Sequence, residues 1–172
     1  MEFTTILDSR KSIRTYTGEP ISEESLKKII HAANVAPVGL AKYETLHLTV
    51  VKCKEMLTEL EKNASEIFKT EGRSYFYGAP ELVIVSTSAT DNVGYSNAAI
   101  VAQNMALAAV DEGVGACHIW GCMMALMKNS ELIKKLGIPE GFTPTCAIAL
   151  GKTEETYAPR DGRDDRISMN CI

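Results

Sequence analysis

Apolar residues recur along this chain at two spacings, and the helical spacing is the more extensive. Leu26, Ile29 and Ala33 fall on one side of a helix, so we expect a helix over 22–34 with Ser22 as its N-cap. The same kind of spacing predicts helices over 4–10, 54–70 and 96–112, and one capped by Ser130. The 96–112 segment is apolar on most sides, which predicts that it is buried all round, in a core or in a subunit interface.

The second spacing is that of β-strands. Residues 46–51 alternate and are rich in β-branched side chains, and residues 82–85 are all apolar, as in a strand covered on both faces. Further strands are expected over 116–120 and 145–150. Helices and strands are mixed without regular alternation, which favours an α+β or layered α/β/α domain. We expect one domain over 1–172, with polar residues 152–172 as a C-terminal arm that is either frayed or docked on a partner.

Composition narrows the class of protein. The 172 residues carry 18 basic and 22 acidic side chains, a formal charge of −4, so a global cationic field for nucleic acid is excluded. The longest nearly apolar stretch is shorter than the ~20 residues that cross a bilayer. Five scattered cysteines without a CxxC pair and the lack of an apolar leader indicate a reduced, cytoplasmic protein. The three histidines have no metal-ligand spacing, and we expect no metal site.

Two basic clusters are candidates for binding an anion. Arg10, Ser12 and Arg14 share one face if residues 10–14 are extended, and arginine forks with a short hydroxyl suit a phosphate. The alternative is a solvated turn beside a helix C-terminus. The second cluster, in the tail, consists of Arg160, Arg163 and Arg166 among aspartates, and alone it is typical of a solvated segment. Two such clusters in an acidic chain suit one polyanionic ligand held from two directions.

The order of these and other motifs resembles the FMN-dependent nitroreductase family, as a short member of it. The resemblance rests on Arg10–Arg14, Pro20, Ala32–Pro37, Gly78–Pro80, Ala102–Ala109, Gly113–Gly115 and the arginines after Gly151. It implies an α+β fold, a three-layer α/β/α sandwich with a mixed, largely antiparallel central sheet, in an intertwined homodimer. It also implies bound FMN at the interface between the two subunits.

The resemblance assigns roles to particular residues. Arg10 and Ser12 would hold the FMN phosphate and ribityl chain, with Lys11 nearby. Arg14 would lie against the pyrimidine edge, where a cation stabilises the charge that two-electron reduction brings to N1 and O2. The amide of Trp120 or Gly121 would reach flavin N5, since a glycine lets the backbone approach a ligand closely. Arg160 and Arg163 would close on the phosphate, with Arg166 as an alternative.

One segment departs from the family pattern. After Ala36–Pro37 the family shows Ser, then an Asn, then Gln-Pro-Trp, whereas residues 38–45 here are VGLAKYET. The polar side chains that would touch the flavin from the second subunit are therefore missing. Backbone contacts from Pro37, Val38 and Gly39 remain available, and Tyr43 is a candidate to cover the ring or the substrate.

The resemblance implies a ping-pong oxidoreductase. Hydride would pass from NADH or NADPH through FMN to an electron-poor small molecule, such as a nitroaromatic, a quinone or a flavin. No catalytic acid or base of the protein is required, because solvent can protonate the acceptor. Three alternatives stay open: halide removal from an aromatic ring, fragmentation of the flavin, and a flavin carrier or degenerate dimeric scaffold without reductase activity.

Overall fold

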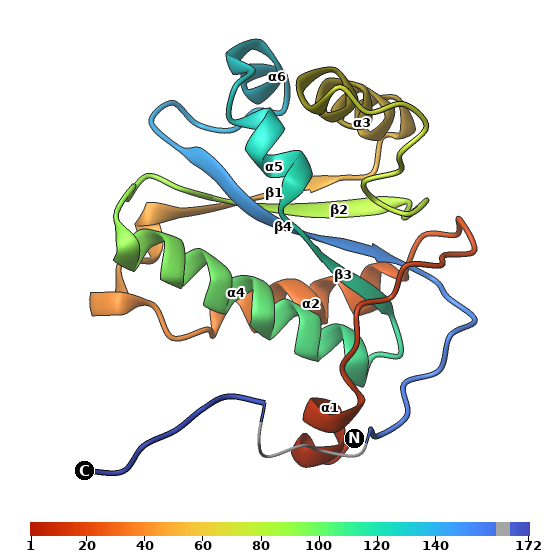
Figure 1. Ribbon diagram of the computed structural model, residues 1–172, viewed down its shortest axis with the longest axis vertical. Helices are drawn as coiled ribbons and strands as arrows, with labels where there is room; N and C mark the ends of the chain where they lie inside the picture. The colour runs from red at the N-terminus through yellow and green to blue at the C-terminus, as the bar shows by residue number, and fades with distance from the viewer. Residues whose placement is uncertain (161–165) are drawn as a thin grey trace.

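The computed structural model describes residues 1–160 and 166–172 and is built around a four-stranded sheet (Figure 1). The strands are β1 (Leu46–Val51), β2 (Glu81–Thr87), β3 (Gly115–Ile119) and β4 (Thr143–Gly151), in the order β1-β2-β4-β3. Every neighbouring pair is antiparallel. The expected mixed sheet is thus wrong for the described strands, because β4 enters between β2 and β3 and runs opposite to both.

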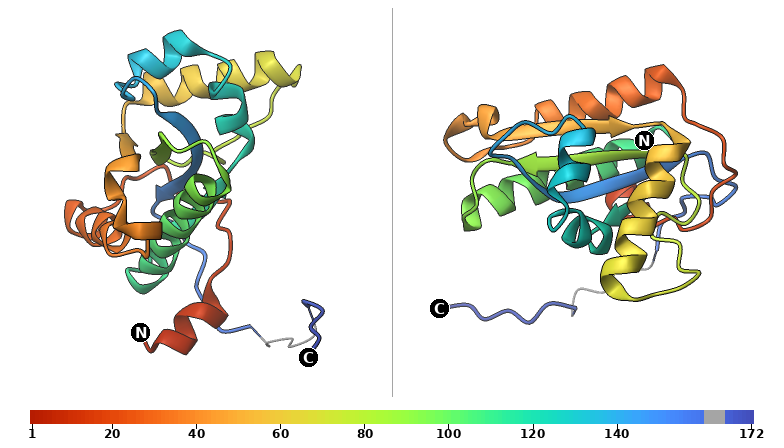
Figure 2. Two further views of the ribbon diagram at one scale, coloured as in Figure 1. Left: turned by 90° about the vertical axis from the view of Figure 1, so that its left-hand side faces the viewer. Right: turned by 90° about the horizontal axis from the view of Figure 1, so that it is seen from above.

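Helices cover both faces of the sheet, which confirms the three-layer expectation. On one face lie α2 (Glu23–Asn34) and α4 (Asn92–Asp111) (Figure 1). On the other lie α3 (Lys54–Phe68), α5 (Gly121–Leu126) and α6 (Ser130–Lys135), as Figure 2 shows. The short α1 (Phe3–Ser9) packs against α4, and the single-turn helices η1 (Gly39–Ala41) and η2 (Tyr43–Thr45) follow α2. No helix in the described part of the chain has the length and apolar character to cross a bilayer.

Capping side chains set where these helices begin. Ser22 accepts from the Ser25 amide at 3.0 Å, which confirms it as the N-cap of α2. Asp91 accepts from the Gly94 amide at 2.7 Å, so α4 begins earlier than its apolar pattern suggests. Asn129 caps α6 through the Leu132 amide at 3.0 Å, where we had expected Ser130 to be the cap.

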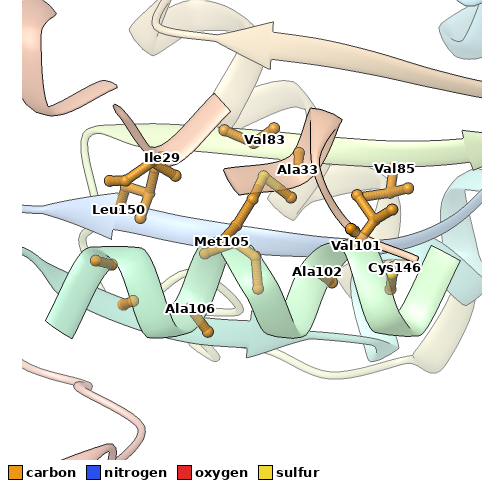
Figure 3. Packing of buried hydrophobic residues seen from close by; sticks show 14 of the residues in the cluster. Ile29, Ala33, Val83, Val85, Val101, Ala102, Met105, Ala106, Cys146 and Leu150 are labelled. Atoms are coloured by element: carbon orange, nitrogen blue, oxygen red, sulfur yellow. The ribbon is translucent and has the colours of Figure 1, made fainter. Parts of the chain in front are cut away.

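The larger core fills the space between α2, α4 and the sheet (Figure 3). Ile29 and Ala33 of α2 meet Met105 of α4 there, and all three side chains are buried. Small residues on the inner face of α4 let it lie close to β2 and β4: Ala98, Ala102, Ala106 and Ala109 are 0–3% exposed. Strand β2 is buried along its whole length, as its unbroken apolar run predicted.

The outer face of α4 is not enclosed by its own chain. Val93 and Ile100, which lie seven residues apart and share this face, are 58% and 38% exposed. Burial all round is therefore wrong for the single chain. An apolar face of this kind remains open to a neighbouring subunit.

Candidate functional site

Residues 10–14 are extended and run along the free edge of β3. The Ile13 amide donates to the Ala116 carbonyl at 2.9 Å, and the Ile13 side chain is fully buried. Arg10, Ser12 and Arg14 fall on the other side of the segment, as the alternation predicted. These three residues with the thiol beneath them are here named the arginine cradle.

That thiol belongs to Cys117, which the sequence gave no reason to place in the site. Burial raises its pKa, and the charge of Arg14, a hydrogen bond from Ser12 and the charge of Arg10 oppose the rise. All three cradle side chains therefore act on the pKa of one thiol of β3. The pairing of Ile13 with β3 brings them near it, and no local sequence pattern reveals this pairing.

Lys11 points away from the cradle. Its Nζ lies 2.9 Å from the Glu155 carboxylate, and this hydrogen bond lowers the pKa of Glu155. Among the described residues, Arg10 and Arg14 form no such ion pair. Within the described part of the chain, the cradle thus presents two cations without a salt bridge, whereas the charge of Lys11 is partnered by Glu155.

Arg14 lies over an aromatic ring at the edge of the cradle. Its guanidinium carbon is 5.6 Å from the centroid of Tyr77. Tyr77 has a φ of +57°, in the left-handed region that a tyrosine rarely adopts. The sequence analysis missed this residue, although the run of aromatic residues at 75–77 was a visible signal.

Trp120 and Gly121 join the end of β3 to the start of α5. Their amides have no backbone partner in the part of the chain that the structure describes. A Cβ built on Gly121 would meet nothing within 4 Å, so a ligand has room to reach this backbone. The structure thus leaves these two amides available, as the resemblance requires.

A cavity of about 310 Å³ opens at this corner. Its walls come from the β3–α5 junction and from residues 68–77, and include Tyr77, Trp120 and Gly121. His118 also lines it, and its Nε2 lies 3.2 Å from the Gln103 Oε1 on α4. Burial, with a smaller contribution from Arg10, lowers the pKa of His118, which favours the neutral imidazole.

The C-terminal segment docks on the N-terminal one. The Tyr157 hydroxyl accepts from the Ala116 amide at 3.2 Å and donates to the Val114 carbonyl at 2.9 Å, and burial raises its pKa to about 12. The amide and Nε of Arg160 both donate to the Asp8 carbonyl, at 3.2 and 3.0 Å. Arg160 therefore lies at the end of α1, against Asp8, which precedes Arg10 by two residues. Arg163 falls outside the described residues, and Arg166 is exposed.

Pro37, Val38 and Gly39 lie elsewhere, at the N-terminal end of α4 (Figure 1). The Gly39 amide donates to Asn97 Oδ1 at 3.0 Å, and Val38 is buried. The Tyr43 hydroxyl donates to the Ala36 carbonyl at 2.9 Å, so this group is engaged within its own loop.

The cradle lies at the opposite end of α4. There, the N-terminal ammonium pairs with Asp111, the last residue of the helix, and α1 packs against it. Asn97, which holds Gly39, comes 14 helical positions before Asp111, or about 21 Å along the axis. Within one chain, Pro37–Gly39 are therefore well separated from the end of α4 against which α1 packs.

The described residues contain no cluster of three or more His, Cys, Asp or Glu side chains that could hold a metal ion. The chemical groups at this corner are the cations of the cradle, the amides of Trp120 and Gly121 and the aromatic walls of the cavity. Together these groups form a site where the cradle can bind an anion beside a small cavity with aromatic walls.

The sequence and fold of the chain are similar to those of known proteins. The nitroreductase family model matches residues 7–152. A Cr(VI) reductase of Pseudomonas sp. (strain G-1) is 27% identical over 160 residues, which cover 85% of this chain but 64% of that longer protein. An FMN reductase (NADPH) of Bacillus subtilis is 25% identical over 183 residues, or 98% of this chain and 70% of that protein.

A solved structure extends the likeness to the fold. The crystal structure of a nitroreductase with bound FMN from Bacteroides fragilis superposes with a TM-score of 0.87 at 26% identity, and covers 99% of both chains. The match in sequence spans most of the chain and the match in fold spans nearly all of it. The chain belongs to the nitroreductase family.

Proposed function

We propose that this protein is an FMN-dependent oxidoreductase that passes hydride from NADH or NADPH to an electron-poor small molecule. Nitroaromatics, quinones and free flavins are the acceptor classes. The observation that carries the proposal is the arginine cradle, in which two arginines without an ion-pair partner among the described residues share one face with a serine, beside the amides of Trp120 and Gly121.

The residues present fit an FMN. Arg10 and Ser12 supply a charged fork and a hydroxyl for the phosphate and ribityl oxygens. Arg14 supplies a cation for the pyrimidine edge, and Tyr77 keeps that guanidinium at the rim of the cavity. Arg160, held beside Asp8, adds a further cation close to α1. Bound FMN would supply the hydride chemistry, and the protein would supply its placement and electrostatics.

The relatives support this chemistry. The Bacteroides fragilis structure holds FMN, and the Bacillus subtilis protein is named an FMN reductase that uses NADPH. The chain described here lacks about a third of the length of the two curated relatives.

A homodimer completes the proposed site. The outer face of α4 exposes Val93 and Ile100, and Pro37–Gly39 lie at the far end of that helix from the cradle. A second copy on this face would place its own Pro37–Gly39 against the first copy's cradle. Obligate interfaces are apolar in this way.

The test is an absorbance spectrum of the purified protein before and after FMN is added and the mixture desalted. We expect a yellow protein that retains flavin in proportion to the chain and is bleached by NADH or NADPH under anaerobic conditions. A protein that retains FMN but stays oxidised would be a carrier. A protein that retains none would be a scaffold, and either result overturns the oxidoreductase proposal.

A further inference from the structure

The cavity beside Trp120 has one charged wall. Phe68, Tyr75, Tyr77 and Trp120 give it aromatic sides, and Arg73 is the one formally charged side chain among the described lining residues. The guanidinium of Arg73 lies 5.3 Å from the centroid of Tyr75, and Arg73 forms no salt bridge in the described part of the chain.

The loop that carries Arg73 is held in place rather than free. One carboxylate oxygen of Glu61 on α3 accepts from the Ser74 hydroxyl at 2.9 Å and from the Tyr75 and Phe76 amides at 2.8 and 3.0 Å. The Tyr75 hydroxyl also meets the Thr70 hydroxyl at 2.7 Å. The carboxylate nearest to Arg73 in this network is therefore engaged with the backbone, and Tyr75 is a fixed platform for the guanidinium.

The size and walls of the cavity restrict what it can hold. About 310 Å³ lies at the small end of the range for ligand pockets, which suits a single-ring compound. Aromatic walls favour a planar apolar ring. The exposed guanidinium of Arg73, which has no ion-pair partner among the described residues, favours a carboxylate or another planar anion, which its fork binds through two parallel hydrogen bonds.

We propose that this cavity selects planar acceptors that carry a negative charge, with Arg73 as the residue that recognises the anionic group. The proposal rests on the proposed oxidoreductase function and names its acceptor class. Arg73 and Gly121 line the same small cavity, so one compound held by Arg73 also reaches the corner where the reducing edge of the cofactor is placed. Arg73 acts here as a specificity-determining residue.

The test compares two acceptors that differ by one charge, 4-nitrobenzoate and 4-nitrobenzamide, on the flavin-loaded protein. We expect the Arg73→Gln variant to lower kcat/KM for nitrobenzoate by about tenfold and to leave nitrobenzamide within about twofold. Arg73→Lys, which keeps the charge and loses the fork, should fall between the two. Lys128→Gln removes an exposed cation that does not line the cavity and should change neither acceptor.

A second measurement separates this proposal from the oxidoreductase proposal. Equilibrium dialysis of 4-nitrobenzoate against the same variants reports binding without turnover. If Arg73→Gln binds 4-nitrobenzoate more weakly but neither the original protein nor any variant turns it over, the reductase function is contradicted and the anion site is supported. Equal effects on both acceptors, or none, would overturn the anion site while leaving the reductase.

NADH or NADPH, the proposed electron donor, is the other anion that could bind to Arg73. If Arg73→Gln instead raises the KM for NADPH more than that for NADH, with the acceptor ratio unchanged, then the residue recognises the nucleotide phosphate. That result would also overturn the proposal.

Discussion

The arginine cradle and the loop around Gly39 lie at opposite ends of α4, and their polar groups differ in whether they have partners. In the cradle, Arg10 and Arg14 are unpaired within the described residues, and the neighbouring amides of Trp120 and Gly121 are free. In the loop, the Gly39 amide is bonded to Asn97 and the Tyr43 hydroxyl to Ala36, while Leu40 is 87% exposed.

The difference shows which region can hold a charged ligand. Unpaired cations and amides gain from an anion because their partner is otherwise water. The loop has few polar groups left to offer, but it presents an apolar surface suited to a subunit contact or to the face of a flat ring. The cradle would therefore supply most of the affinity for FMN. The loop around Gly39 of a second copy would supply an apolar surface that fits against the flavin ring.

The largest expected effect concerns the cradle. Arg10→Ala should weaken FMN binding by about 10- to 100-fold, because it removes a charge-assisted hydrogen-bond donor from the phosphate. Lys11→Ala is the matched control, since its charge is already paired with Glu155, and it should cost less than about threefold. Fluorescence titration of the apoprotein with FMN measures both. Equal losses in the two variants would show that net charge, not the cradle geometry, binds the cofactor.

A medium effect concerns the loop. Asn97→Ala leaves the Gly39 amide without its partner, so the free energy of unfolding should fall by about 1–3 kcal/mol, with faster loss of FMN. Asn104→Ala is the control on the same helix, because its amide bonds to the Ala32 carbonyl at 3.2 Å, away from the loop. Urea unfolding and FMN release rates check both variants. If the two variants release FMN at the same rate, the loop does not touch the flavin.

The smallest effect concerns the imidazole of His118, whose pKa is lowered by burial and, to a smaller extent, by the charge of Arg10. The pKa of His118 is lowered in the folded protein from its ordinary value of 6.5. Below that value the unfolded chain therefore binds a proton at His118 more readily than the folded chain does. Stability should therefore fall as the pH decreases through and below that value, and should not depend on His118 above it.

The measurement is the melting temperature between about pH 7.5 and about pH 5.5. His118→Gln should lose less stability over this interval than the original chain. His31→Gln, at an exposed position on α2, is the control and should follow the original chain. An unchanged pH dependence in His118→Gln would show that the buried imidazole does not contribute.

Local rules were enough for most elements. The helix after Ser22, the strand over 46–51 and the fully buried β2 follow from spacing and capping within a few neighbouring residues. The sequence did not reveal the short α5, whose six residues are too few to show a period. It also could not exclude parallel strands, because strand direction depends on which strand enters between which neighbours.

For the candidate site, too, some features could be predicted from the sequence and others could not. The shared face of Arg10, Ser12 and Arg14 follows from alternation in an extended segment, and could be predicted from the sequence. The position of Cys117 beneath them, the pairing of Lys11 with Glu155 and the ring of Tyr77 under Arg14 could not. Each of these three contacts joins segments that are far apart in the sequence, so no local pattern could reveal it.

The sequence by itself determined most of the elements, the α+β class and the cationic face that Arg10, Ser12 and Arg14 share, because these depend on side-chain chemistry at short range. The tertiary structure decided which cations remain unpaired, where the cavity opens, and that Pro37–Gly39 lie at the far end of α4 from the cradle. These depend on contacts between residues far apart in sequence, and packing of α4 against the sheet fixes them.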